Sequence, residues 1–326
     1  MFGMRIQILT GSREKFPLIR LHDFDHLPHW FRELGHDVDV VTKSEWGKFY
    51  FKYLKFKPDV IIAVGLIAAL PAFLKRAGLI KKAILVNDWT DYWTDMMATK
   101  YPLAWLAFFE HYGIQHADFV VTSTIANLER CKLFNKKCYY RVHGVDLDFT
   151  KAKPLKLEGD FKILYFGSQE KSKRLDRLIT AVNDVSKNIN CHLYLIGKQN
   201  PDFQKIANQN VHFLGFVSDD DAVSYFKACD VVAMTMDSDG SPKLFQYFRA
   251  GKPLLVLRGK ISNIMTHLEN AYIAQDLATG ILELYKKPEL RKKLADGILK
   301  MPTKSWKAVA EEYIKILDAE ISAKNG

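Results

Sequence analysis

Residues 237–253 give the clearest indication of the fold and read Asp237-Ser238-Asp239-Gly240-Ser241-Pro242-Lys243-Leu244-Phe245-Gln246-Tyr247-Phe248-Arg249-Ala250-Gly251-Lys252-Pro253. It predicts a strand end, a glycine loop, a helix, a glycine and a further strand. Ser241 suits the N-cap, Pro242 the first helical turn and Gly251 the helix end. A helix that begins there presents free N–H groups and partial positive charge, which favour a phosphate group. The alternative is an ordinary βαβ unit, which carries the same residues at its boundaries.

The rest of the chain repeats this alternation of short apolar runs and amphipathic stretches. The runs lack period-2 alternation, which is typical of parallel strands covered by helices on both faces. We therefore expect an α/β protein of two doubly wound, Rossmann-like domains facing a central cleft, with ligands at the carboxyl ends of the strands. The expected strands are 5–10, 37–42, 59–64, 83–86, 118–123, 161–166, 191–196, 211–214, 230–235 and 253–257, and the clearest helices are 175–186, 219–228 and 242–250.

Length and composition agree with two soluble domains. A chain of 326 residues, 48% of them hydrophobic, exceeds one ordinary core. We expect a first domain over 1–150, a linker over 151–160, a second domain over 161–302, and a final helix over 303–326 that packs on the first domain. The four cysteines form no CxxC pair, and the longest apolar run is shorter than the ~20 residues of a membrane span. These features predict a cytoplasmic protein.

The 237–253 stretch resembles the donor-binding signature of the family 4 retaining glycosyltransferases, the "glycosyl transferases group 1" domain. Three further stretches resemble that family in order and spacing: Tyr165-Phe166-Gly167 through Lys173-Arg174-Leu175-Asp176, Val211-His212-Phe213-Leu214-Gly215-Phe216-Val217, and His143-Gly144-Val145-Asp146. The resemblance implies the GT-B architecture, a nucleoside-diphosphate sugar as donor, retention of anomeric configuration and no required metal. It makes the first domain the acceptor side and the second the donor side.

The donor-site residues follow from the same resemblance. Lys173 is the expected catalytic cation, which stabilises the departing diphosphate, and Asp239 is a second catalytic candidate. Ser168 stands where the family has Arg, and Gln246 where it has Glu. The expected donor-binding residues are Gly167, Ser168, Lys173, Gly215, Phe216, Gly240, Ser241, Pro242, Lys243, Leu244 and Gln246.

On the acceptor side, the run from Asp88 to Trp93 follows a predicted strand. We expect Asp88 to be catalytic, and Trp89, Asp91 and Trp93, with Gly11 of the first loop, to hold sugar hydroxyls and stack on sugar rings. The alternative is a loop whose aromatic rings pack inward.

A metal site is not expected. Asp237-x-Asp239 resembles the metal-binding DxD of the other glycosyltransferase fold, but the helix after it is typical of GT-B. Asp-x-Asp also recurs elsewhere in the chain, as at 146–148 and 219–221.

The formal net charge of +10 predicts attraction to anionic partners. Residues 46–57 mix lysine with aromatic residues, which favours an interfacial helix on an anionic membrane. The alternative is a core helix whose lysine stems lie along its apolar surface. No finger, basic helix-turn-helix or stacking-sheet pattern indicates nucleic-acid binding.

The leading hypothesis is therefore sugar transfer from a nucleoside-diphosphate sugar to a lipid-linked or glycan acceptor. One alternative is a GT-B protein that binds nucleotide sugars after losing catalysis, which the departures at Ser168 and Gln246 suggest. Another is a sugar-nucleotide epimerase on the same fold.

Overall fold

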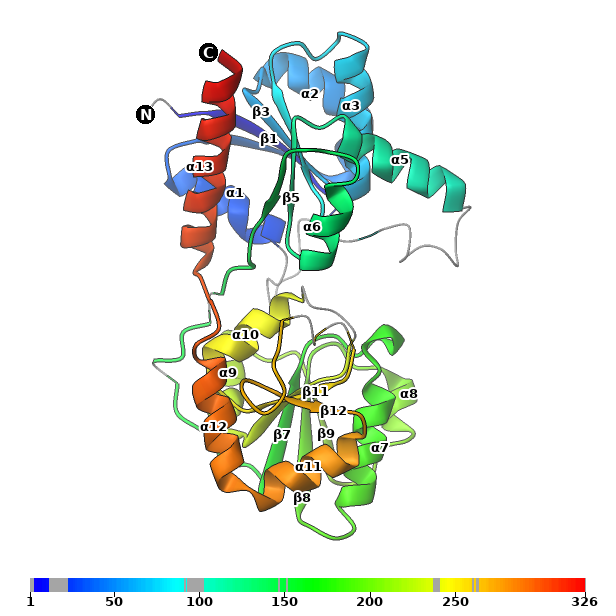
Figure 1. Cartoon of the computed structure of the whole chain (residues 1–326), viewed down its shortest axis with the longest axis vertical. Coiled ribbons are helices and arrows are strands. Elements are labelled where there is room, and N and C mark those ends of the chain that lie inside the picture. Colours follow the sequence, from blue (N-terminus) through cyan, green and yellow to red (C-terminus); the bar gives the residue numbers. More distant parts are fainter. Residues whose placement is uncertain are drawn as a thin grey trace. The chain divides into compact units, whose positions relative to one another are not determined.

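A computed structural model gives the architecture (Figure 1). It describes residues 3–11, 23–90, 92, 103–145, 147–150, 152–236, 241–259, 261 and 264–325. The chain forms two compact units. The first contains the described residues up to Gly144 together with those from Lys304 onward, and the second contains those of Val145–Thr303.

The first unit is built on a six-stranded parallel sheet of order β2-β1-β3-β4-β5-β6. Its strands are β1 (Arg5–Leu9), β2 (Asp37–Val41), β3 (Val60–Val64), β4 (Ile84–Asp88), β5 (Phe119–Thr122) and β6 (Cys138–Tyr140). Its helices include α1 (Asp23–Glu33), α2 (Phe49–Phe56), α3 (Ala69–Arg76), α5 (Leu103–Gln115), α6 (Ile125–Cys131) and α13 (Trp306–Asn325). One core cluster joins Leu9, Val41 and Ile61 of the sheet to residues of α2, α3, α5 and α6, so these helices cover one face.

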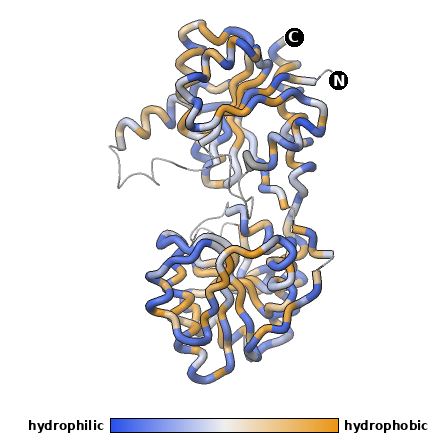
Figure 2. The backbone as a smooth tube through the Cα atoms, turned by 180° about the vertical axis from the view of Figure 1, so that it is seen from behind, coloured by the Kyte–Doolittle hydropathy of each residue, from blue (hydrophilic) through white to orange (hydrophobic). Residues whose placement is uncertain are grey.

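The second unit has a six-stranded parallel sheet of order β12-β11-β10-β7-β8-β9. Its strands are β7 (Phe161–Phe166), β8 (Cys191–Ile196), β9 (Val211–Gly215), β10 (Val231–Met234), β11 (Leu254–Leu257) and β12 (Tyr272–Ala274). Its helices include α7 (Leu175–Val185), α8 (Pro201–Gln204), α9 (Asp219–Ala228), α10 (Pro242–Ala250), α11 (Leu277–Lys286) and α12 (Pro288–Ile298). Hydrophobic residues gather in the strands of each unit (Figure 2).

These sheets confirm the predicted fold class of two Rossmann-like domains. The short strands β6 and β12 are absent from the sequence prediction. Each has three residues, and pairing with a neighbouring strand, which the local sequence does not encode, makes them strands.

The C-terminal helix α13 returns to the first unit, as expected. The Trp306 ring stacks on His26 with centroids 4.8 Å apart. Gly144 makes room for that ring, because a Cβ there would lie 2.4 Å from it. Further along α13, Tyr313 packs edge-on against Phe31 of α1. Aromatic packing therefore holds the end of the chain on the first unit.

The substitution Trp306→Ala is expected to lower the free energy of unfolding of the first unit by about 3–5 kcal/mol, because it leaves a cavity between α13 and α1. Urea denaturation measures the loss. Lys307→Ala, at an exposed position of the same helix, is the control and should change the free energy by less than about 0.5 kcal/mol. Equal effects of the two substitutions would contradict this account of the docking.

Candidate nucleotide-sugar site

The carboxyl edge of the second sheet holds most of the predicted donor residues. The chain order reverses between β7 and β10, which are paired neighbours although β8 and β9 intervene in sequence. Ligands of doubly wound sheets bind at such a switch point. The loops that follow these two strands also touch, because Thr235 Oγ1 donates a hydrogen bond to the backbone oxygen of Lys173. Lys173 and the start of α10 therefore belong to one edge.

Helix α10 begins and ends as the sequence predicts. Ser241 is the extended N-cap, Pro242 occupies the first turn, and Gly251 ends the helix in the left-handed conformation with φ 64°. The Ser241 side chain makes no capping hydrogen bond, which leaves the first turn to attract an anion through its N–H groups and dipole. Asp239 and Gly240 lie outside the described residues.

Lys243, in the first turn of α10, is the most unusual charged group of this edge. It is only 4% exposed. Its Nζ donates a 2.8 Å hydrogen bond to the Tyr165 hydroxyl and lies 4.3 Å from the centroid of that ring. The pKa of Lys243 is lowered to about 7, first by burial and second by the charge of Lys173, with Glu170 acting in the opposite direction. The positive charge of Lys173 therefore acts on the buried ammonium group of Lys243.

Glycines let the backbone approach this lysine. Gly167 has φ 139°, and a Cβ there would lie 3.3 Å from Lys243 Cδ and 3.4 Å from its Nζ. Gly197, after β8, has φ 125°, and a Cβ there would lie 2.2 Å from the Gly167 oxygen. Of the other predicted residues, Ser168 is half-buried, Leu244 is buried, Gly215 accepts a hydrogen bond from Gly197 N, and Phe216 is exposed.

Two glutamines of this unit carry buried polar atoms that make no hydrogen bond with the described residues. Gln246, one turn into α10, is 6% exposed, and its Oε1 is unpaired. Gln169, which follows Ser168, is 2% exposed; its Oε1 accepts from Asn200 N, and its Nε2 is unpaired. Buried polar atoms are rarely left unpaired, so both suit a ligand.

Sequence reasoning missed Gln169, Tyr165 and Tyr247. The Tyr165 hydroxyl accepts from Lys243 and donates to the Ser168 oxygen at 2.9 Å. The Tyr247 hydroxyl accepts from Phe166 N and lies 3.2 Å from the Ala233 oxygen, so it links β7 to β10. Each residue looks like ordinary core in the sequence, and only its long-range partners reveal its position.

On the first unit, the structure buries two predicted acceptor-side residues. Asp88 pairs with Arg141 at 3.0 Å and accepts a 3.1 Å hydrogen bond from the Tyr313 hydroxyl of α13. Trp89 is buried in the core, and its Nε1 donates to Glu110 Oε1 at 2.7 Å. The Trp89 ring therefore packs inward, as the alternative interpretation expected, and the Asp88 carboxylate is occupied by structural partners.

The other acceptor-side candidates are less informative. Gly11 is exposed just after β1, next to the Trp46 ring. Asp91 and Trp93 lie outside the described residues.

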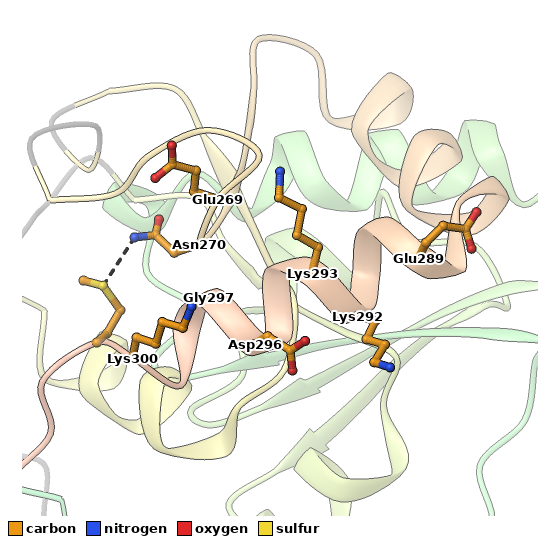
Figure 3. Close-up of a pocket in the computed structure, with 9 residues that line it drawn as sticks. Glu269, Asn270, Glu289, Lys292, Lys293, Asp296, Gly297 and Lys300 are labelled. Carbon is orange, nitrogen blue, oxygen red and sulfur yellow. Dashed lines mark hydrogen bonds between the residues drawn. The ribbon is translucent and has the colours of Figure 1, made fainter.

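A groove of about 650 Å³ lies elsewhere on the second unit, along α12 (Figure 3). Its charged residues are of both signs: Lys292, Lys293 and Lys300, with Glu269, Glu289 and Asp296. The charges balance, so the groove offers a diphosphate less attraction than the two lysines at the carboxyl edge.

Comparison with known proteins connects this edge to a function. Residues 160–287 match the family model described as "Glycosyl transferases group 1", which covers β7 to α11. The comparison with curated protein sequences gives no significant match. Residues 160–287 therefore form a glycosyl transferases group 1 domain.

Solved structures share the fold of this chain over nearly its whole length. Sucrose-phosphate synthase from Thermosynechococcus elongatus aligns with a TM-score of 0.77 and 14% identity, over 98% of this chain and 100% of that chain. HepE of Anabaena, in complex with UDP and glucose, aligns with a TM-score of 0.74 and 16% identity, over 97% of this chain and 100% of that chain. A putative UDP-N-acetylglucosamine 2-epimerase from Listeria monocytogenes aligns with a TM-score of 0.66 and 11% identity, over 98% of this chain and 97% of that chain. At these identities the likeness concerns the fold.

The lowered pKa of Lys243 predicts how the stability of the second unit depends on pH. Between about pH 7 and the ordinary lysine pKa of ~10.4, the unfolded chain binds one more proton than the native chain, so stability rises with pH in that window. Below about pH 7 the buried ammonium group is charged in both states, so it lowers the free energy of unfolding by its full amount. Lys243→Met is expected to raise the melting temperature most at pH 6, with a difference that shrinks toward pH 10. Thermal melts across this range measure it.

The control for these melts is Lys198→Met, at an exposed position of the same unit, which should show no such trend. A melting temperature that Lys243→Met lowers at pH 6 would show that the ammonium group stabilises the fold.

Proposed function

We propose that this protein is a retaining glycosyltransferase that takes a UDP-sugar as donor and binds its diphosphate between Lys173 and the first turn of α10. The observation that carries the proposal is the convergence of Lys173 and the buried Lys243 at the switch point of the sheet. Two cations held together repel each other, and a diphosphate is a ligand that removes this repulsion. The choice of UDP is supported by the similar fold of HepE, whose structure contains UDP and glucose.

The two lysines supply what the reaction needs when the bond between the sugar and the diphosphate breaks. Negative charge then grows on the departing diphosphate, and preorganised cations and N–H groups stabilise it. Lys173 is half-buried and can reach a phosphate oxygen, while Lys243 is fixed by Tyr165. Donor binding favours the protonated form of Lys243, so nucleotide affinity falls as the pH rises above about 7. These groups act without a metal ion.

The nucleoside part of the donor has candidate partners in the unpaired atoms of the glutamines. Gln246 Oε1 can accept a hydrogen bond from a ribose hydroxyl. Gln169 Nε2 can donate to an oxygen of the same nucleotide. A bound donor thus satisfies both buried atoms.

The acceptor is proposed to be a lipid-linked molecule or a glycan. Two alternatives share the fold: a nucleotide-sugar binder without turnover, and an epimerase, which the Listeria structure favours. Hydrolysis of the donor in the absence of acceptor supports the transferase. Nucleotide-sugar binding without turnover supports the binding protein, and isomerisation of the donor supports the epimerase.

A membrane surface is the proposed docking site of the first unit. No helix among the described residues is long and apolar enough to cross a membrane. However, Phe51 of α2 is 74% exposed and shares a helix face with the exposed Lys48 and Lys55. Trp105 of α5 is 66% exposed, on a second helix that covers the same sheet face. Exposed rings beside basic charge fit an anionic bilayer.

Replacing Lys173 with Ala is expected to lower turnover about 10²–10³-fold by removing a cation that stabilises the leaving group. The melting temperature should stay nearly unchanged, because the Thr235 hydrogen bond goes to the backbone of Lys173. Lys171→Ala, two residues away at an exposed lysine, should keep wild-type turnover. Gln246→Glu should keep or improve affinity for UDP.

Titration calorimetry with UDP decides the location of the site. Unchanged affinity in both Lys173→Ala and Lys243→Met would show that the diphosphate binds elsewhere.

The double substitution Lys48→Glu/Lys55→Glu is expected to reduce co-sedimentation with anionic liposomes at low salt, because it reverses the charge beside Phe51. Lys52 is left in place, since it pairs with Glu45 at 2.8 Å. Lys198→Glu/Lys300→Glu changes the net charge equally at exposed positions of the second unit and is the control. Failure of the wild-type protein to co-sediment would refute the membrane proposal.

A further inference from the structure

We propose that Glu158, His192 and His212 form a binding site for a divalent transition metal, with Zn²⁺ as the occupant. One ligand atom of each residue lies within 4.8 Å of the others. Two imidazole nitrogens and a carboxylate oxygen are a donor set that zinc uses, with a fourth position left to water.

The strands of the second sheet bring the two histidines together. Tyr194 of β8 pairs with His212 of β9, and His192 lies two residues before Tyr194, so all three share one face of the sheet. His192 Nδ1 and His212 Nε2 lie 2.8 Å apart. Zinc–nitrogen bonds of about 2.0–2.1 Å place two nitrogens of a tetrahedral site about 3.3 Å apart, so binding opens this pair by about half an ångström.

The surrounding residues fix the orientation of the His192 ring. Its Nε2 lies 3.0 Å from Asn190 Oδ1, which accepts the ring proton and leaves the Nδ1 lone pair directed at His212. A hydrogen bond of this kind typically positions a metal-binding histidine. The backbone at Gly159 has φ 91° and passes close to the ring, so a Cβ there would lie 2.6 Å from His192 Cδ2.

Glu158 is held above the same face. The Tyr194 hydroxyl donates a 3.0 Å hydrogen bond to its backbone oxygen, and the Tyr194 ring stacks on His212. Its side chain is exposed and so free to rotate toward the two nitrogens.

The site lies far from the proposed donor. Glu158 precedes β7, and His192 and His212 are the second residues of their strands, so the cluster is at the amino edge of the sheet. Along β8, the distance from His192 to the carboxyl end is about 13 Å at ~3.3 Å per residue. A metal here would cross-link the segment before β7 to β8 and β9, with a structural effect.

The test uses the full-length protein, freed of metal with EDTA and titrated with Zn²⁺ by calorimetry. The proposal expects equimolar binding and a rise in melting temperature. His212→Gln and Glu158→Gln should lose both, and Asn190→Ala should weaken binding roughly 10-fold or more. His29→Gln, at an exposed histidine of the first unit, should bind zinc as the wild type does.

Co²⁺ substitution identifies the ligands, because the cysteines are the competing donors. A visible d–d spectrum without a thiolate charge-transfer band supports the site. A thiolate band overturns the proposal, and so does zinc binding that is unchanged in both His212→Gln and Glu158→Gln. If the wild-type protein binds no zinc, the proposal is also wrong, and the two histidines are only a hydrogen-bonded pair. Turnover should survive EDTA. Its abolition with rescue by Mg²⁺ or Mn²⁺ counts against metal-independent transfer, not against the zinc site.

Discussion

The pairing of β10 with β7 is the constraint on which the proposed donor site depends. These strands come from distant parts of the sequence, and the sheet reverses its order between them. Their adjacency places the Lys173 loop beside α10. The buried Tyr247 reinforces it, because one hydroxyl contacts the backbone of both strands. Without this pairing, the first turn of α10 and Lys173 would lie apart and could not act together on the proposed diphosphate.

The buried charge of Lys243 lowers the stability of the second unit and suits the binding of an anion. A buried ammonium group costs free energy unless it is paired, and the direct partner of Lys243 is a neutral hydroxyl. The pKa of Tyr165 is itself raised well above its usual range by burial, so the phenol stays protonated and supplies no negative charge. In the proposed donor complex the diphosphate supplies the missing counter-charge, so donor binding would also relieve the cost of the buried charge. Perturbed groups of this kind gather at functional sites.

Local chemistry explains what the sequence could predict. Ser241, Pro242 and Gly251 fix the boundaries of α10, because capping depends on adjacent residues. The side-chain environments could not be predicted in this way. Lys243 is buried against a tyrosine 78 residues away, and Asp88 against Arg141, 53 residues away. The sequence placed both Asp88 and Trp89 after a strand, but Asp88 is the last residue of β4 and only Trp89 follows it. The sequence also could not tell that both side chains point into the core. The cluster of Glu158, His192 and His212 has no motif spacing, because strand register assembles it.

The C-terminal helix α13 also contributes to the buried ion pair of Asp88 and Arg141. Breaking a buried ion pair by removing one partner costs about 3–5 kcal/mol, because the remaining charge is uncompensated. Tyr313 of α13 adds a hydrogen bond to the Asp88 carboxylate, and its ring lies against Phe31. The helix therefore completes the polar interior of the first unit and also covers α1. An aspartate at the end of β4 that resembled a catalytic residue in the sequence thus joins the sheet to the last helix of the chain.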